Sequence, residues 1–505
     1  MANPLYDELF GAHSGKSTPF LLLCEGQTIT HEAFLQVAAS FAHMLTSSGL
    51  KPGDRLAAQV QKSPQALALY AACVQAGLVF LPLNTAYTVD ELTYFIENSG
   101  ARMVVCDSGR ADGIRPVADR LEAQLLTLDA DGSGSLAEGA RNLPKTFTTV
   151  ARDADDLAAF LYTSGTTGRS KGAMLTQANL LSNAKTLADH WRFDSDDVLI
   201  NALPIFHTHG LFVATNVTLV AGGAMIFLPK FDIDAIIDKM PMATTMMGVP
   251  TFYTRLLDDE RFTGDLVKDL RLFISGSAPL LSETHVQFER RTGHRILERY
   301  GMTETNMNTS NPYDGERRAG TVGFPLPGVE LKVCDPKSGR ELPQGDVGVI
   351  EVRGPNVFKG YWQMPEKTAE ELREDGFFIT GDLGRIDEDG YVHIVGRDKD
   401  LIISGGYNIY PKEIELVLDD QPGVLESAVI GVPHADFGET VVGVLVAEPG
   451  ATPDLDAVAK AVQETLARFK HPRKLVVIDA LPRNTMGKVQ KNVLRERFND
   501  LFVLT

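Results

Sequence analysis

The chain has 505 residues, 44% of them hydrophobic, and a formal net charge of −18 at pH 7. This length exceeds what one hydrophobic core usually supports, so we expect at least two domains. The acidic balance disfavours nucleic acid and an anionic membrane as partners, because both would repel the chain. Four scattered cysteines form no CxxC pair or Cys/His cluster, which indicates reduced thiols and no zinc site.

The N-terminal region alternates helical and strand patterns over residues 30–145, which indicates an α/β fold. Residues 1–8 lack the basic and apolar regions of a signal peptide, so we expect a cytoplasmic protein. The most apolar stretch, residues 66–83, is interrupted by polar, glycine and proline residues. It is therefore interpreted as a core helix followed by a strand, with no membrane insertion.

A loop rich in glycine and hydroxyl residues follows the apolar run 157–162 and precedes a second strand-like run, 172–176. Its accessible backbone N–H groups, its hydroxyls and its lysine suit a polyphosphate. A Walker A loop is excluded, because that motif needs GxxxxGK[ST] opening a helix; an ordinary surface turn is the alternative. The residues expected to contact phosphate are Thr163, Ser164, Gly165, Thr166, Thr167, Gly168 and Lys171.

Two histidines, His207 and His209, follow in the segment LPIFHTHGLF. No acidic or thiol ligand lies near them in the sequence, so a metal site is disfavoured. We interpret the segment as a wall of a carboxylate and phosphate site; the alternative is a packed loop whose histidines bond to the backbone. Further on, Pro250 is expected to open a helix that carries Arg255 beside an apolar face. An arginine there is usually solvated, so its role stays open at this point.

Two later strands end in residues suited to a ligand, as strands of open α/β sheets often do. The first, 272–275, precedes Ser277. The second leads into Thr303 and Glu304, which suit phosphate and Mg²⁺ respectively, while Tyr300 suits stacking on a base. The alternative is an ordinary strand and turn with a solvated Glu304.

Beyond residue 323 the turn signals predict β-hairpins, consistent with a distorted β-barrel. Asp382 in this region suits ribose hydroxyls. The charged segment 396–400 and the glycine-rich residues after it form the best candidate linker, followed by a compact α+β domain. Residues 468–497 hold nine Lys/Arg against two acids, which suits anionic ATP and CoA or else a solvated face, and Lys488 stands on a turn there.

Five motifs in order, TSGTTGRSKG, YGMTE, TGD, GRDKD and GK, resemble the adenylate-forming superfamily of acyl-CoA synthetases over essentially the whole chain. Within it the chain looks most similar to malonyl-CoA synthetases. The segments that carry this resemblance are LPIFHTHGLF, GVPTFYTRLL, SGSAPL, ERYGMTETNMNTSNPYDG and LPRNTMGKVQKN.

The resemblance implies an N-terminal domain, 1–397, made of two α/β subdomains and a distorted β-barrel. A hinge at 398–400 and a small mobile α+β domain at 401–505 follow. It also implies a reaction in which malonate and ATP give malonyl-adenylate and pyrophosphate, after which CoA displaces AMP, with Mg²⁺ on Glu304. The hinge position is often aspartate in relatives and is Lys399 here.

The resemblance also assigns residues to roles. Catalytic residues are Lys488, Glu304, Thr163 and His207. The nucleotide contacts are the loop residues named above with Ser277, Ala278, Glu298, Arg299, Tyr300, Gly301, Met302, Thr303, Asp382, Arg397 and Lys488. The substrate carboxylate is held by Arg255, Ser277 and His207, and CoA and hinge residues are Lys399, Gly405 and Gly406.

Two alternatives remain at this stage. One is a ligase of the same superfamily for methylmalonate or another short carboxylate. The other is a non-catalytic sensor of nucleotide or acyl-CoA. The sequence does not predict the oligomeric state.

Overall fold

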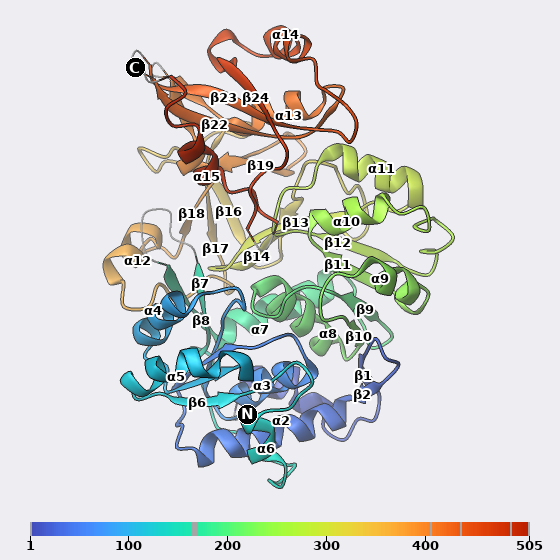
Figure 1. The fold of residues 1–505 in the computed structure, drawn as a ribbon, viewed down its shortest axis with the longest axis vertical. Coiled ribbons are helices and arrows are strands. Elements are labelled where there is room, and N and C mark those ends of the chain that lie inside the picture. Colours follow the sequence, from blue (N-terminus) through green and yellow to red (C-terminus); the bar gives the residue numbers. More distant parts are fainter. Residues whose placement is uncertain (1–2, 164–169, 405–406, 435–436, 485–486, 503–505) are drawn as a thin grey trace. The chain divides into compact units, whose positions relative to one another are not determined.

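The computed structural model describes the chain apart from residues 1–2, 164–169, 405–406, 435–436, 485–486 and 503–505 (Figure 1). The chain divides into two compact units: Met1–Glu330 with Val352–Phe378, and Leu331–Glu351 with Ile379–Thr505. None of the helices in the described residues combines the length and hydropathy needed to span a bilayer.

The first unit contains a six-stranded sheet in the order β6-β5-β3-β4-β7-β8, in which only the β7–β8 pair is antiparallel. Leu92, Phe95 and Ile96 of one covering helix and Ile114 of another pack against its buried strands. The strands are β3 (Arg55–Gln59), β4 (Val79–Pro82), β5 (Met103–Cys106), β6 (Gln124–Thr127), β7 (Leu157–Thr163) and β8 (Lys171–Thr176).

A nine-stranded sheet, in the order β15-β14-β13-β12-β11-β9-β10-β1-β2, also belongs to the first unit. Its central strands, from β13 to β1, run parallel, and antiparallel strands close both edges. The strands are β1 (Pro19–Leu22), β2 (Thr28–Thr30), β9 (Val198–Asn201), β10 (Ala224–Phe227), β11 (Thr245–Gly248), β12 (Leu272–Ser275), β13 (Leu297–Met302), β14 (Asn306–Ser310) and β15 (Phe324–Pro325).

Helices cover these two sheets, as an α/β layer fold requires. Their ends follow local sequence rules: the Thr88 and Glu91 side chains form a capping box on α4, and Gly100 ends that helix in the left-handed conformation with φ 60°. The helices are α1 (Pro4–Leu9), α2 (His31–Ser47), α3 (Pro64–Gln75), α4 (Val89–Ser99), α5 (Ala111–Arg120), α6 (Ser135–Ala140), α7 (Gln177–His190), α8 (Asn216–Ala221), α9 (Ile233–Lys239), α10 (Pro250–Leu257), α11 (Ser282–Thr292) and α12 (Pro365–Glu371).

The region predicted as a distorted barrel forms a four-stranded sheet in the order β16-β17-β18-β19. Closure of this sheet into a barrel stays a prediction. The strands are β16 (Glu330–Cys334), β17 (Gly348–Arg353), β18 (Phe378–Ile386) and β19 (Val392–Arg397).

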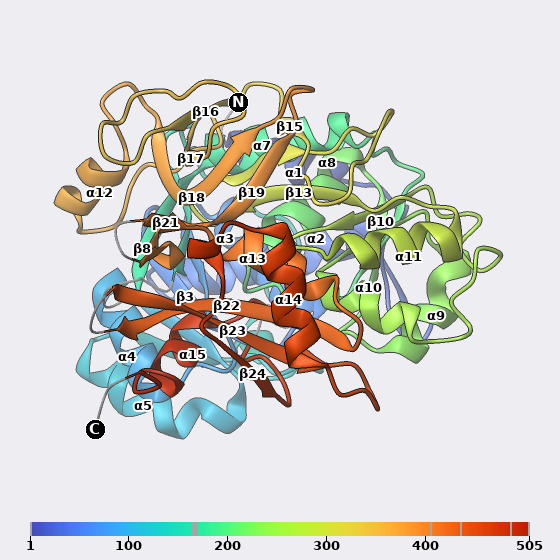
Figure 2. The same cartoon turned by 90° about the horizontal axis from the view of Figure 1, so that it is seen from above.

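The C-terminal part of the second unit is an α+β layer built on two long antiparallel strands, β22 and β23, which Figure 2 shows from above. Residues alternate between the sheet's faces: Val429 packs with Leu418 and Val462 of two helices, whereas Ile430 packs with Leu494 of a third. The elements are β20 (Ile402–Ser404), β21 (Tyr407–Ile409), α13 (Pro411–Asp419), β22 (Val424–His434), β23 (Gly438–Ala447), α14 (Leu455–Thr465), β24 (Lys474–Ile478) and α15 (Lys491–Arg497).

The predicted α/β class, with a smaller α+β part at the C-terminus, is therefore confirmed. The core helix and following strand expected in residues 66–83 are α3 and β4. The predicted hinge, 398–400, is a short 3₁₀ turn that lies within the second compact unit. Its role as a boundary between moving parts stays a prediction.

Candidate active site

The order of strands in the nine-stranded sheet reverses at β9, because β10 lies on one side of β9 and the next strand, β11, lies on the other. In open parallel sheets such a switch point opens a crevice at the carboxyl ends of the strands, where ligands bind. Residues 202–209 follow β9, and Arg255 lies on the helix after β11. Ser277 follows β12, and Arg299 lies in β13, so the predicted site segments meet at one edge of one sheet.

His207 and His209 adopt arrangements that suit a ligand-binding wall. His209 is fully buried, its Nδ1 lies 3.1 Å from Ser277 Oγ, and its Nε2 has no hydrogen-bond partner among the described residues. The His209 backbone N–H donates to His207 Nδ1 at 3.3 Å. Burial, and then the positive charge of Arg299, lower the pKa of His207 to about 4. His207 is thus neutral at pH 7, with its proton on Nε2 as a hydrogen-bond donor.

Ser277 itself holds an unusual backbone conformation, with φ 73°. A serine pays a steric cost in this left-handed region, and residues held there often belong to functional sites. Asn306 has φ 51° and accepts a hydrogen bond of 2.5 Å from Thr208 Oγ1, on the same histidine segment. Two strained residues therefore contact residues 207–209, which favours the site interpretation over a plain packed loop.

Arg299 is a buried cation without a carboxylate partner in the described residues. It is 4% exposed, and its Nε and Nη2 atoms have no hydrogen-bond partner there. Burial lowers its pKa to about 9. A Cβ on Gly276 would lie 2.3 Å from the guanidinium carbon, so only glycine leaves room for the group. A buried charge of this kind is normally paired, so the arrangement fits an anionic ligand.

Sequence reasoning assigned Arg299 to the nucleotide and gave it no role in carboxylate binding. The signal for a stronger role was an arginine inside a buried strand, in the segment ERYGMTE. Arg255, which was given that role, lies in the last turn of α10 and is exposed. Its guanidinium carbon stands 5.5 Å from the centre of the Phe231 ring.

The phosphate-loop residues at the two strand ends are described, whereas the predicted contacts from Ser164 to Gly168 lie outside the described residues. Thr163 and Lys171 pair across the β7–β8 hairpin, so the loop between them is a strand–strand connection as predicted. Thr163 Oγ1 is buried without a hydrogen-bond partner in the described part of the chain. An unused hydroxyl at the mouth of the loop fits a phosphate oxygen.

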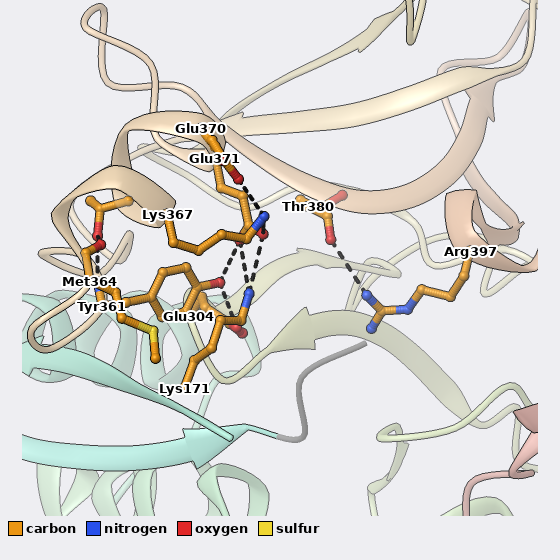
Figure 3. Close-up of polar contacts among 10 residues, drawn as sticks. Lys171, Glu304, Tyr361, Met364, Lys367, Glu370, Glu371, Thr380 and Arg397 are labelled. Atoms are coloured by element: carbon orange, nitrogen blue, oxygen red, sulfur yellow. Dashed lines mark hydrogen bonds and ion pairs between the residues drawn. The ribbon is translucent and has the colours of Figure 1, made fainter. Parts of the chain in front are cut away.

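Glu304 is 5% exposed, which rules out the solvated alternative. Its carboxylate lies 3.0 Å from the hydroxyl of Tyr361, and that hydroxyl also lies 2.6 Å from Glu371 (Figure 3). Lys171 lies beside the same tyrosine, with its ammonium 4.1 Å from the ring centre. Strand β8, the turn between β13 and β14, and the segment around α12 thus bring a metal-ligand candidate and the phosphate-loop lysine together.

The remaining nucleotide candidates in the first unit lie within or directly after strands β12 and β13. Glu298 is 7% exposed and its carboxylate lies 3.4 Å from His285 Nδ1, which assigns it a structural contact. Tyr300 is half-buried, with its hydroxyl 4.0 Å from Met302 Sδ. Ala278 and Thr303 are partly exposed, like Gly301. Their contacts with a nucleotide stay predictions.

In the second unit, Asp382 and Arg397 pair across β18 and β19 at 2.6 Å, and Asp382 is 4% exposed. Arg397 also donates to the Thr380 carbonyl at 3.4 Å (Figure 3). Lys488 is solvent-exposed in part, yet the surrounding protein, and then the charge of Arg397, lower its pKa to about 8. Asp382, Arg397 and Lys488 are thus close enough to interact electrostatically. Gly405 and Gly406 lie outside the described residues.

Much of the positive charge of the basic C-terminal segment, residues 468–497, is neutralised by ion pairs with acidic side chains. Several of its cations form ion pairs within the second unit: Lys470 with Glu413, Arg483 with Glu426, Lys491 with Glu415 and Arg495 with Asp400. The charges of those four residues are therefore paired within the chain, which neither of the two interpretations from the sequence predicted. Attraction of anionic ATP and CoA by the other cations of this segment stays a prediction.

Within the described residues no three His, Cys, Asp or Glu side chains converge to hold a metal ion. Mg²⁺ is often bound through one or two carboxylates together with substrate phosphates, so the buried carboxylate of Glu304 fits it.

In the described part of the chain, an open α/β sheet has a topological switch point, a buried unpaired arginine beside it and a strand–strand loop preceded by an unpaired buried hydroxyl. This is the arrangement of a class of enzymes that bind nucleotides and carboxylates. The chain belongs to the AMP-binding enzyme family: residues 12–362 match that family, and residues 413–488 match the AMP-binding enzyme C-terminal domain.

Similar proteins divide by substrate. ATP-bound MatB from Rhodopseudomonas palustris superposes with a TM-score of 0.97 at 59% identity, covering 99% of this chain and 100% of that one. A malonate–CoA ligase from Arabidopsis thaliana is 36% identical over 83% of this chain and 74% of its own length. A feruloyl-CoA synthase from an Amycolatopsis species is 35% identical over 94% of both. Sequence identity near 35% therefore does not indicate which acid a relative of this chain uses.

Proposed function

We propose that the chain is an AMP-forming acid–thiol ligase that joins malonate to coenzyme A. Malonate attacks the α-phosphorus of ATP, giving malonyl-adenylate and pyrophosphate, and the CoA thiol then displaces AMP to give malonyl-CoA. The observation that carries the proposal is the buried, unpartnered guanidinium of Arg299 beside Ser277 and the neutral His207. The similarity to MatB and to a malonate–CoA ligase supports it.

Malonate has two carboxylates, and one of them must be free to react. The reacting carboxylate needs hydrogen-bond donors such as the His207 Nε2–H, whereas the distal carboxylate needs a cation that stays in place. Arg299 and Arg255 supply two cations, and each can form a bidentate fork. An acid without a second carboxylate would leave one of these two cations unpaired, which costs about 3–5 kcal/mol where the unpaired cation is buried.

The chemistry of the first step needs positioning and electrostatic stabilisation rather than a covalent partner from the protein. Lys488 donates hydrogen bonds to the malonate carboxylate and the α-phosphate, and Thr163 and the loop hold the outer phosphates. Asp382 accepts hydrogen bonds from the ribose hydroxyls. Glu304 would hold Mg²⁺, which would supply positive charge near the departing pyrophosphate. In the second step, rotation at 398–400 would withdraw Lys488 and bring Gly405 and Gly406 to the CoA thiol. The cytoplasmic location remains a prediction.

The test is a pyrophosphate-release assay with ATP and a panel of acids: malonate, methylmalonate, acetate and ferulate. We expect kcat/KM for malonate to exceed that for acetate by at least ~100-fold, because acetate leaves a buried cation unpaired. Lys488→Ala should abolish release with malonate. A preference for acetate or ferulate would reject the proposed substrate. ATP binding without pyrophosphate release from any acid would favour the nucleotide sensor.

A further inference from the structure

Lys171, the lysine that ends the phosphate loop, is held by a carboxylate of its own chain (Figure 3). Its Nζ lies 3.2 Å from both Oε1 and Oε2 of Glu371. The pair is 200 residues apart in sequence and largely buried, with the lysine side chain 18% and the glutamate side chain 21% exposed. An ion pair so shielded is stronger than one on the open surface.

Glu371 is held ready as an anion by three donors. Besides Lys171, the Tyr361 hydroxyl donates at 2.6 Å and Lys367 Nζ lies 2.9 Å away. Burial alone would raise its pKa, but the Tyr361 and Lys367 hydrogen bonds and the Lys171 charge hold the pKa of Glu371 below its usual value. Tyr361 is 2% exposed, and its backbone N–H donates to Thr368 Oγ1 at 2.9 Å, so the hydroxyl is fixed in position.

An ammonium group has three N–H donors, and both carboxylate oxygens of Glu371 lie within hydrogen-bonding distance of the Lys171 ammonium group. Phosphate oxygens that reach Lys171 must therefore compete with a carboxylate that is already in place. We infer that Glu371 is a positioning residue that competes with pyrophosphate for Lys171, weakens the hold on this product and so speeds its departure. This inference rests on the proposed function for the role of Lys171 as a phosphate contact, and it adds a residue that controls product release.

A purely structural role for the same pair makes the opposite prediction. If Glu371 only anchors α12 to β8, its loss displaces Lys171 and weakens pyrophosphate binding. If Glu371 competes for Lys171, its loss releases the ammonium group and strengthens binding. The sign of the change in affinity therefore decides between the two roles.

The experiment measures the dissociation constant of magnesium pyrophosphate by calorimetry on the full chain. Glu371→Gln keeps the shape and the Tyr361 contact, and we expect it to bind pyrophosphate about tenfold more tightly, the effect of one charged hydrogen-bonded pair. Glu370→Gln is the matched control, since Glu370 neighbours it, contacts Lys367 at 2.8 Å and has a 65% exposed side chain. It removes the same charge and should change affinity less than about twofold.

Three further measurements test the mechanism. In a Lys171→Met background, Glu371→Gln should have no effect on pyrophosphate affinity, because the shared partner is absent. Glu371→Asp keeps the charge, so its pyrophosphate affinity should stay closer to that of the unaltered chain than the affinity of Glu371→Gln does. In turnover with ATP and malonate, Glu371→Gln should form enzyme-bound pyrophosphate at an undiminished rate in the first turnover. Its steady-state rate should be lower, because the bound pyrophosphate leaves more slowly.

Unchanged or weaker pyrophosphate binding by Glu371→Gln would overturn the inference, as would an equal gain from Glu370→Gln. A gain that persists without Lys171 would also overturn it. An unaltered chain that binds pyrophosphate but does not turn over malonate would reject only the proposed acid. An unaltered chain that does not bind pyrophosphate would reject both proposals.

Discussion

At the scale of single residues, the candidate site contains two arginines with different surroundings. Arg299 is buried against Gly276, and its position is fixed by the strand that carries it. Arg255 is exposed on α10 and its guanidinium faces the Phe231 ring. A buried cation fixes the charge of the ligand, whereas an exposed one can close over a ligand after it has bound. We therefore expect a substitution of Arg255 to change the selectivity between acids more than the stability of the fold.

The first prediction follows from this difference. Arg255→Leu should lower kcat/KM for malonate by at least about tenfold, because a charge-assisted pair with the distal carboxylate is lost. The midpoint of thermal unfolding should not change, since the side chain is exposed. For propionate, which has no second carboxylate, kcat/KM should fall much less. A similar loss on both acids would remove Arg255 from the acid site.

Two further residues make stability depend on pH. His13 and His31 are 3% and 1% exposed, and their rings lie tilted by 31° with centres 4.4 Å apart. Their Nε2 atoms lie 2.6 and 3.2 Å from the backbone carbonyls of Leu219 and Gly223. Burial, and then the neighbouring His13, lower the pKa of His31 to about 4, and burial also lowers that of His13. Both rings are therefore neutral in the folded chain at pH 7.

A lowered histidine pKa means that the unfolded chain binds the proton first as the pH falls. The stability from neutral His31 is therefore present above the ordinary value near 6.5 and is lost between there and about 4. From pH 7 to pH 5 we expect the free energy of unfolding to fall by roughly 2 kcal/mol through this residue. His31→Gln should reduce that fall in urea titrations. An identical pH dependence in both proteins would show that His31 does not titrate on unfolding.

At the scale of elements, the strands and their order along the chain could be predicted, because apolar runs and turn residues are local signals. The loop between β7 and β8 and the helix opened by Pro250 followed from the same signals. The pairing of Lys171 with Glu371 could not, since it joins residues far apart in sequence. Nor could the close fit of the Arg299 guanidinium against Gly276, which depends on the pairing of two strands.

A second structural element had no local signal. Residues His209–Thr215 form a π-helical turn, a rare conformation that is frequent at functional sites. The turn brings Gly210 so close to residue 204 that a Cβ would lie 2.2 Å from the Pro204 carbonyl oxygen. Glycine is thus required by a contact within the folded loop, and the histidine wall depends on it.

Gly210→Ala should therefore displace the segment that carries His207 and His209. We expect kcat/KM for malonate to fall by about tenfold or more and stability to fall by about 1–3 kcal/mol, as for other overpacked sites. Gly109→Ala is a suitable control, because nothing lies within 4 Å of a Cβ there. Normal activity in Gly210→Ala would mean that the wall adjusts freely.

At the scale of the whole molecule, the proposed mechanism needs a pivot. In the second unit, Arg397 is held by Asp382, and Asp400 is held by Arg495 of α15 at 2.6 Å. Only residues 398 and 399 lie between these two anchored positions. Hinges are short segments of this kind that absorb large torsion changes, so the ion pairs agree with the predicted hinge at Lys399.

Proline fixes φ near −65° and should restrict such a pivot. We expect Lys399→Pro to release pyrophosphate at a near-normal rate in a single turnover, yet to form malonyl-CoA at least about tenfold more slowly. Lys399→Ala leaves the torsion free and serves as the control. Equal slowing of both half-reactions, or equal damage by alanine, would show that residue 399 is not a hinge.

The chain contains two tryptophans, and their places make them natural optical probes. Trp191 is fully buried and its indole N–H donates to Ser310 Oγ at 2.9 Å, so its emission should stay constant while the fold is intact. Trp362 follows Tyr361 directly and lies beside Arg55, whose guanidinium carbon is 5.4 Å from its ring. Indole fluorescence responds to nearby charge. When pyrophosphate draws Lys171 from Glu371, the colour and intensity of Trp362 emission should change, so product departure can be followed in real time without an attached dye.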